Sequence, residues 1–72
     1  MKTEIETTKD FDNLYPEAVL NVHETKITTI SHLQRVLLIG YNRAARLLEA
    51  MEADGIVGPL KPDGTRDYLE YE

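Results

Sequence analysis

The residue types and spacing that could do chemistry are concentrated in one predicted helix, Tyr41–Asp54. At about 100° per residue, Asn42, Arg43 and Arg46 fall on one side of this helix near its N-terminal end. Glu49 follows on the same side. An arginine can donate two hydrogen bonds to guanine O6 and N7, and an asparagine can pair with adenine in the same bidentate way. Because the first two turns of a recognition helix reach base edges in the major groove, this side predicts contact with bases. The common alternative is that exposed arginines form an ordinary solvated face.

Other side chains could contact the phosphate backbone rather than the bases. Arg35 lies on the preceding predicted helix, and Lys61 and Arg66 flank a turn near the C-terminus. The predicted helix start at Gly40–Tyr41 leaves amide groups and a partial positive charge for a phosphate. A salt bridge explains Arg35 equally well, and a solvated charge at a strand edge explains Lys61 better than a phosphate contact does. For Arg66 the two explanations are balanced.

Chemistry of an enzyme is not expected from this chain. The sequence has no cysteine and no Walker loop, and His23 and His32 have no acidic or thiol ligands at metal spacing. Ser31 is better explained as a helix cap than as a nucleophile, and the carboxylates between residues 49 and 54 are typical of a solvated helix end. We therefore expect no catalytic residue, no metal site and no cofactor.

The elements that must position these side chains begin with a helix that starts near Asp12 or Asn13, either of which can cap it, and ends around residues 24–25. Its apolar face repeats at helical spacing and comprises Leu14, Tyr15, Ala18, Val19 and Val22. Residues 26–30 are β-branched at four of five positions and predict a very short strand.

A second helix is predicted after this strand, capped by Thr29 or by Ser31, which has capping-box spacing to Gln34. We expect it to stop at Ile39–Gly40, where glycine allows a tight turn. Its predicted apolar face is Ile30, Leu33, Val36 and Leu37. The third helix then runs to Asp54 before Gly55, and its predicted core side is Tyr41, Ala44, Ala45, Leu48, Met51 and Glu52, with the first and last at the margin.

A hairpin is predicted at the C-terminal end. Ile56–Val57 starts one strand, residues 61–64 form a Pro-Asp-Gly turn, and residues 66–71 alternate as a returning strand. The fold class is therefore mainly α with a small β-hairpin, in the order of a winged helix-turn-helix: three helices, a short strand and a wing hairpin. We expect a flexible lead over residues 1–11 and one domain over residues 12–72.

The formal net charge of −5 would by itself argue against nucleic acid as a partner. The charge is unevenly distributed, however. Residues 25–48 carry +4 and no acid at all, whereas residues 1–24 carry −4 and residues 49–72 carry −5. Chance segregation is the alternative explanation. The basic centre predicts which face meets DNA, and the acidic total predicts weak non-specific affinity.

No apolar run approaches the ~20 residues that cross a bilayer, and no secretory signal follows Met1. The absence of cysteine fits a reducing compartment. These features predict a cytoplasmic protein without membrane contact.

The stretch Ile39–Arg46 reads IGYNRAAR, and it is accompanied by Gln-Arg at 34–35, Met-Glu at 51–52 and Gly-Ile-Val at 55–57. This pattern resembles the γ domain of FtsK/SpoIIIE-type DNA translocases, with similarity from Leu14 to Arg66. The chain departs from the family at Leu38, where a basic residue is usual, and in its Arg-Asp-Tyr-Leu at 66–69, where Arg-Glu-Val-Leu is usual.

The resemblance implies a winged helix at the C-terminal end of a bacterial septal motor that acts in chromosome segregation and cell division. Such a domain would read G-rich, strand-skewed orienting sites in double-stranded DNA and would activate a Xer-type tyrosine recombinase. It implies that Asn42, Arg43, Arg46 and Glu49 face the major groove and that Arg66 is the wing contact.

A protein-interaction module is the competing class. The acidic ends, with Tyr68 and Tyr71 expected to be exposed, could dock a basic protein. A stand-alone relative, phage- or plasmid-borne in a bacterial host, could occupy a recombinase or translocase surface as a competitor.

Overall fold

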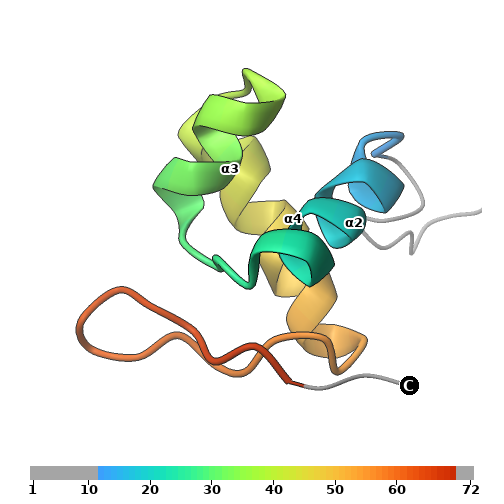
Figure 1. The fold of residues 1–72 in the computed structure, drawn as a ribbon. Helices are drawn as coiled ribbons and strands as arrows, with labels where there is room; N and C mark the ends of the chain where they lie inside the picture. Colours follow the sequence, from blue (N-terminus) through green and yellow to red (C-terminus); the bar gives the residue numbers. More distant parts are fainter. Residues whose placement is uncertain (1–11, 70–72) are drawn as a thin grey trace, which may run out of the picture.

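The computed structural model describes residues 12–69, which form three helices followed by an extended C-terminal segment (Figure 1). Helix α2 spans Tyr15–Thr25, α3 spans Ile30–Leu37 and α4 spans Tyr41–Ala53. The prediction of a mainly helical domain with three helices in this order is confirmed for the described residues. The predicted lead over residues 1–11 and the predicted exposure of Tyr71 lie outside these residues. None of the described helices is both long and apolar enough to span a membrane.

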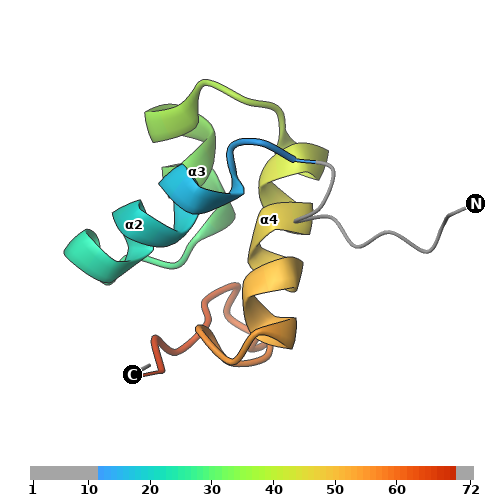
Figure 2. The same ribbon diagram turned by 90° about the vertical axis from the view of Figure 1, so that its right-hand side faces the viewer.

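Helix α4 lies beside both other helices, and α3 packs on it more extensively than α2 does (Figure 2). The apolar side chains between them form a single core, with each side chain at most 5% exposed. Burying one leucine-sized side chain contributes roughly 1.5–3 kcal/mol. The core residues are Ala18, Val22, Leu33, Ala44, Leu47, Leu48, Met51, Ile56 and Val57.

One assignment to the apolar face of a helix was wrong. Val36 of α3 is 42% exposed, whereas Leu33 on the same helix is fully buried. Tyr41, predicted at the margin of the core side of α4, is 60% exposed. Leu47 was not assigned to the core side of α4, yet it is fully buried. Packing by both α2 and α3 widens the buried arc of α4 beyond the stripe that periodicity alone predicts.

Helix α2 begins later than predicted. Its N-cap is Leu14, which offers no side-chain hydrogen bond, and Pro16 occupies the first turn without needing a donor partner. The side chain of Asp12 accepts a hydrogen bond from the Leu14 amide (3.0 Å), and the Tyr15 amide donates to the Asp12 carbonyl (3.1 Å). Asp12 therefore fixes the turn that leads into the helix rather than capping the helix itself.

The strand predicted at residues 26–30 is not formed. Lys26 adopts a left-handed conformation (φ 63°) and Ile30 already belongs to α3. The intervening threonines make other bonds: the buried Thr28 hydroxyl donates to the Arg66 carbonyl (2.5 Å), and Thr29 caps α3 by accepting from the His32 amide. Without a neighbouring strand, the β propensity of this segment has no ladder to join.

The turn between α3 and α4 also differs from the prediction. Helix α3 ends at Leu37, and the left-handed residue is Leu38 (φ 57°), whose side chain is 88% exposed. Gly40 has an ordinary φ of −81° and is the N-cap of α4. Only residues 38–40 separate the two helices, as in a helix-turn-helix.

Residues 56–69, which we call the C-terminal arm, fold back on themselves below α4 (Figure 1). Gly55 in a left-handed conformation (φ 80°) ends α4, with the Ile56 amide bonded to the Met51 carbonyl (2.9 Å). The described part of the arm contains no strand; a single antiparallel bridge joins Val57 and Tyr68. The predicted turn at residues 61–64 is confirmed, with the Lys61 amide bonded to the Thr65 carbonyl (2.8 Å).

Candidate nucleic-acid interface

The N-terminal half of α4 presents the predicted base-contacting side chains to solvent. Asn42, Arg46 and Glu49 are exposed and succeed one another at spacings of four and three residues, which places them on one face. Their side chains make no hydrogen bond or ion pair with any of residues 12–69. Arg46 is therefore available to a ligand without losing a partner within the described domain.

The start of α4 is open as well. Gly40 supplies no side chain to cap the helix, and the first turn contains no acidic residue. The first amide groups of a helix lack intrahelical partners and carry its positive dipole end. Tyr41, the first residue, is 60% exposed beside them.

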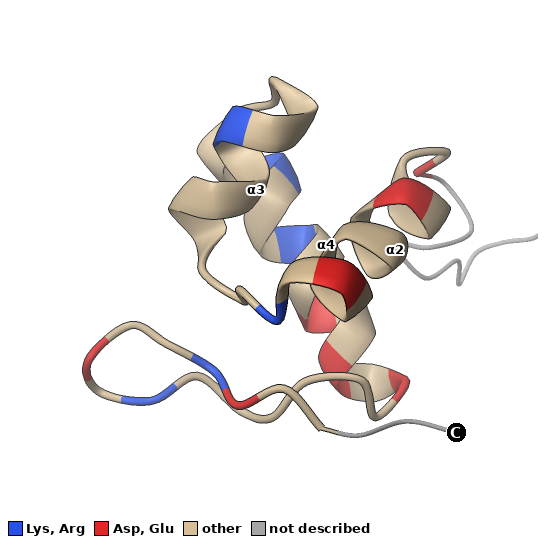
Figure 3. Cartoon of the chain, viewed as in Figure 1, with Lys and Arg blue, Asp and Glu red and all other residues tan. Residues whose placement is uncertain are grey.

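Charge is segregated over the surface of the domain (Figure 3). Lysines and arginines lie on α3 and on the half of α4 that follows the turn, whereas α2 and the far half of α4 carry acids and the arm carries both kinds of charge (Figure 3). Arg35 belongs to this basic region; it is exposed on α3 and has no side-chain partner within residues 12–69. The salt bridge considered for Arg35 is not formed with Glu24 or with any other carboxylate of residues 12–69.

Arg43 differs from Arg46 because it is already paired. Its Nε donates to Asp12 Oδ2 (3.0 Å) and its Nη2 donates to Asp12 Oδ1 (2.8 Å), a bidentate arrangement. The hydrogen bond from Arg43 holds the pKa of Asp12 below its usual value, with the Leu14 amide acting in the same direction. The pair joins the start of α2 to the first turn of α4.

Arg66 is turned toward the protein. Its Nη1 donates to Glu52 on α4 (2.8 Å) and to the Gly58 carbonyl in the arm (2.9 Å), and its side chain is 7% exposed. Arg66 thus ties the arm to the C-terminal half of α4. A contact between Arg66 and DNA would require this side chain to leave Glu52.

Lys61 lies at the tip of the arm, away from α4. Its ammonium group contacts Asp67 (2.8 Å), and this hydrogen bond raises the pKa of Lys61. Across the turn, the Thr65 hydroxyl and amide donate to Asp63 and lower its pKa. The structure therefore separates the predicted cations into two groups: Arg43, Arg46 and Arg35 near the helix-turn-helix, and Lys61 and Arg66 in the arm.

Each histidine ring forms a hydrogen bond with another side chain of the domain. His23 Nδ1 lies 2.5 Å from the Tyr68 hydroxyl, and the two rings meet edge to face. His32 Nε2 lies 2.9 Å from Asn21 Oδ1. The prediction that Tyr68 is exposed was wrong, because its ring packs on the core and its hydroxyl is bonded. Across residues 12–69, no group of three metal-ligating side chains comes together.

Sequence reasoning missed the acids that partner the arginines. Asp12 was predicted only as a helix cap, and Glu52 was predicted at the solvated end of α4 and at the margin of its core side. Their pairs span 31 and 14 residues, so neither helical spacing nor composition could identify them. The one available signal was the charge pattern itself, since the basic window is flanked by acids on both sides.

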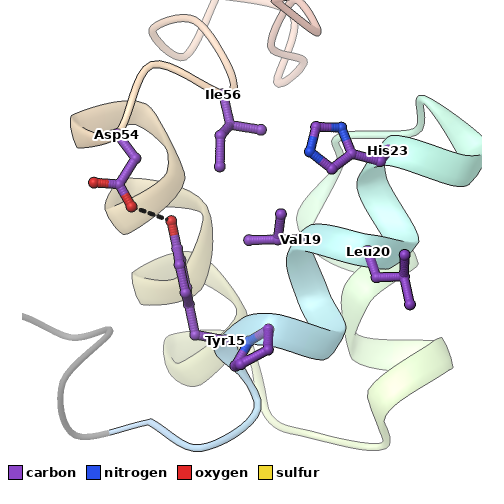
Figure 4. Close-up of a pocket in the computed structure, with 7 residues that line it drawn as sticks. Tyr15, Val19, Leu20, His23, Asp54 and Ile56 are labelled. Atoms are coloured by element: carbon purple, nitrogen blue, oxygen red, sulfur yellow. Dashed lines mark hydrogen bonds between the residues drawn. The ribbon is translucent and has the colours of Figure 1, made fainter. Parts of the chain in front are cut away.

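A groove lies at the other end of α4, between that end and α2 (Figure 4). The Tyr15 hydroxyl closes one side by donating to Asp54 (2.5 Å), and Leu20, which is 57% exposed, lies on the other. The lining is mainly apolar and consists of Tyr15, Pro16, Val19, Leu20, His23, Asp54 and Ile56. None of the predicted base-contacting residues borders this groove.

Comparison with known proteins agrees with the geometry. The sequence pattern of the Ftsk gamma domain matches residues 9–70. A protein named DNA translocase FtsK 1 from Neisseria meningitidis serogroup A is 51% identical over 63 residues, which are 88% of this chain and 8% of the relative. DNA translocase FtsK from Pseudomonas aeruginosa is 52% identical over 58 residues, 81% of this chain and 7% of the relative.

A third relative, DNA translocase FtsK from Shewanella oneidensis, is 47% identical over 64 residues, which are 89% of this chain and 7% of the relative. The chain therefore spans less than a tenth of the length of these curated relatives. The similarity concerns one domain of a much longer protein.

Proposed function

The chain belongs to the family of Ftsk gamma domains, and on that premise we propose that it binds double-stranded DNA in a sequence-specific manner through α4. The observation that carries the proposal is the face formed by Asn42, Arg46 and Glu49, which is exposed and has no partner among the described residues. It follows a three-residue turn after α3, so the first two turns of α4 can enter a major groove.

Each predicted contact has its own part in the proposal. Asn42, Arg43, Arg46 and Glu49 meet base edges, and the arginines favour guanine, so we propose G-rich sites. Arg35 and the open helix start at Tyr41 hold phosphates on either side of the groove. The C-terminal arm acts as the wing, with Lys61 at its tip and Arg66 as a further backbone contact after release from Glu52.

Two finer roles come with the family premise. We propose that the sites are strand-skewed sequences that orient a translocase motor, and that the domain contacts a tyrosine recombinase in chromosome segregation. The relatives are named DNA translocases, which supports DNA as the ligand of the protein that carries this domain. The cell compartment that follows is the bacterial cytoplasm.

A titration with two duplexes tests the proposal. Wild type and Arg46→Ala are titrated with a G-rich duplex and with a scrambled duplex of equal length at two salt concentrations. Loss of one bidentate base contact weakens binding to the G-rich duplex roughly 5- to 150-fold, equivalent to about 1–3 kcal/mol. The salt slope for wild type is about −3 on the log–log scale, because roughly three to four phosphates are neutralised.

Arg35→Ala is the matched control. Arg35 is also exposed and without a described partner, but it lies on α3, where a phosphate contact is expected. Its loss weakens both duplexes by similar factors and lowers the salt slope by about 1. Unchanged binding of Arg46→Ala, or equal weakening of both duplexes by it, would remove α4 as the reading helix.

The competing function is a protein-interaction module, and the apolar groove between α2 and the end of α4 favours it. A domain that shifts neither duplex at low salt would support this second function. Binding to both DNA and a protein is compatible with the fold, because the groove and the base-contacting face occupy opposite ends of α4.

A further inference from the structure

The two members of the Asp12–Arg43 pair differ in how far their side chains are exposed to solvent, and hence to DNA. The Asp12 side chain is 8% exposed, whereas the Arg43 side chain is 45% exposed. Asp12 Oδ1 also accepts from the Leu14 amide (3.0 Å), so the carboxylate is fixed to the backbone of the turn before α2. Arg43 is therefore the outer member of the pair, and the acid that holds it is itself bonded to the backbone.

The guanidinium edge that Asp12 occupies is the one formed by Nε and Nη2. An arginine has a second donor edge, formed by Nη1 and Nη2, in the same plane. Arg43 Nη1 makes no hydrogen bond within residues 12–69. Arg43 Nη2 also donates a long hydrogen bond to Asn13 Oδ1 (3.5 Å). Once Nη2 gives up this bond, the outer edge can donate two parallel hydrogen bonds, which are what guanine O6 and N7 accept.

We propose that Asp12 is a positioning residue that orients Arg43 for guanine and so sets base specificity; this inference rests on the proposed function. Fixing a long side chain before binding removes rotamer freedom that would otherwise be lost on binding. Arg46 has no such support and must be ordered by the DNA itself. Discrimination at the base that Arg43 reads is therefore sharper than at the base that Arg46 reads.

The opposite role would be competition, in which Asp12 stands where a phosphate or base would bind. The two roles differ in sign. A competitor lowers affinity for every duplex, so its removal tightens all of them equally. A positioning residue raises the ratio of affinities for the G-rich and scrambled duplexes, and its removal lowers that ratio.

Two variants of Asp12 distinguish the effect of where its carboxylate lies from the effect of its negative charge. Asp12→Asn keeps an oxygen for the Leu14 amide but removes the charge and one strong bond to Arg43. Asp12→Glu keeps the charge and displaces the carboxylate by one methylene. Glu24→Gln on α2 is the control, because it removes the same charge from an exposed residue that has no described partner.

The expected result is a fall in the affinity ratio of roughly 3- to 10-fold for both Asp12 variants, a part of what a whole bidentate contact contributes. Affinity for the scrambled duplex rises equally in Asp12→Asn and Glu24→Gln and is unchanged in Asp12→Glu. An unchanged ratio in Asp12→Asn, or equal tightening of both duplexes, overturns the positioning role and leaves the proposed function intact.

A second readout needs no DNA. The Arg43 Hε proton is hydrogen-bonded to Asp12, so its NMR exchange with water is slow in wild type and Glu24→Gln and fast in Asp12→Asn. Fast exchange in wild type would overturn the positioning role whatever the DNA data show. If the wild type does not distinguish the two duplexes, the proposed function fails and the specificity role of Asp12 fails with it.

Discussion

The strained residue at the turn, Leu38, leads to a sharp prediction about stability. A non-glycine residue in the left-handed region costs about 1–2 kcal/mol, and Leu38 (φ 57°) gains little packing in return because its side chain is 88% exposed. Leu38→Gly removes that strain. The added freedom of glycine in the unfolded chain takes back about 0.4–1 kcal/mol. We expect a net gain of about 0.5–1 kcal/mol in the free energy of unfolding.

For a domain of this length, such a gain raises Tm by roughly 2–8 °C. Urea unfolding and thermal melting, both followed by circular dichroism, measure it. Leu38→Ala is the first control, because it keeps the strained backbone and changes only the exposed side chain; its stability should stay near that of wild type.

Lys26 provides the second control, since it is also left-handed (φ 63°) but its side chain is engaged. Its ammonium lies 4.7 Å from the centroid of the Tyr68 ring and donates to the His23 carbonyl. Lys26→Gly loses a cation–π contact of about 0.5–1 kcal/mol and therefore gains nothing overall. Equal stabilisation by Lys26→Gly and Leu38→Gly, or destabilisation by the latter, would refute the reasoning.

Three further predictions concern contacts that hold the elements in place. Arg66→Ala should lower the free energy of unfolding by about 1–3 kcal/mol in urea titrations, because it removes the hydrogen bonds to Glu52 and to the buried Gly58 carbonyl that tie the arm to α4; Lys61→Ala, which breaks an exposed pair, should have little effect. Thr29→Ala should cost about 1 kcal/mol in the same assay through loss of the α3 cap, whereas Ser31→Ala should be near neutral, and the reverse order would contradict the capping assignment. The pKa of Asp12 is lower in the folded state than its ordinary value of 3.8, so the unfolded state takes up the proton first as the pH falls. The Asp12–Arg43 pair therefore contributes fully to the free energy of unfolding above pH 3.8. This contribution is lost as the pH drops through the pKa of the folded state. Urea unfolding between pH 6 and about 2.5 should show a decline below pH ~4 that is smaller in Asp12→Asn, and an equal decline in both proteins would contradict it.

Helical periodicity predicted much of the fold, because the apolar residues of α2 and α4 repeat at the correct spacing and Gly55 stands at the end of α4. Prediction from the sequence failed where a residue type is compatible with more than one local conformation. Gly40 was the obvious left-handed residue of the turn, but the chain turns at Leu38. Residues 26–30 have strand propensity, yet the sheet partner that would use it is absent from the described chain.

The sequence predicted which residues form the candidate site but not which of them are already ion-paired. The face with Asn42 and Arg46 follows from spacing along one helix, and both side chains are exposed as expected. The ion pairs of Arg43 and Arg66 depend on the tertiary fold, because their acids lie far away in the sequence. Spacing along α4 therefore predicted that Asn42 and Arg46 are exposed, and only the packed structure could tell which arginines already have a partner.

Gly40 has a consequence for how the molecule can be approached from outside. Its backbone is ordinary, and a methyl group built on its Cα would meet no atom within 4 Å. The fold thus does not require glycine at this position for steric reasons. The space beside Gly40 is open at the turn between α3 and α4. A small side chain added there should leave the stability of the free domain unchanged. It should weaken binding only to a partner whose surface comes into van der Waals contact with the turn.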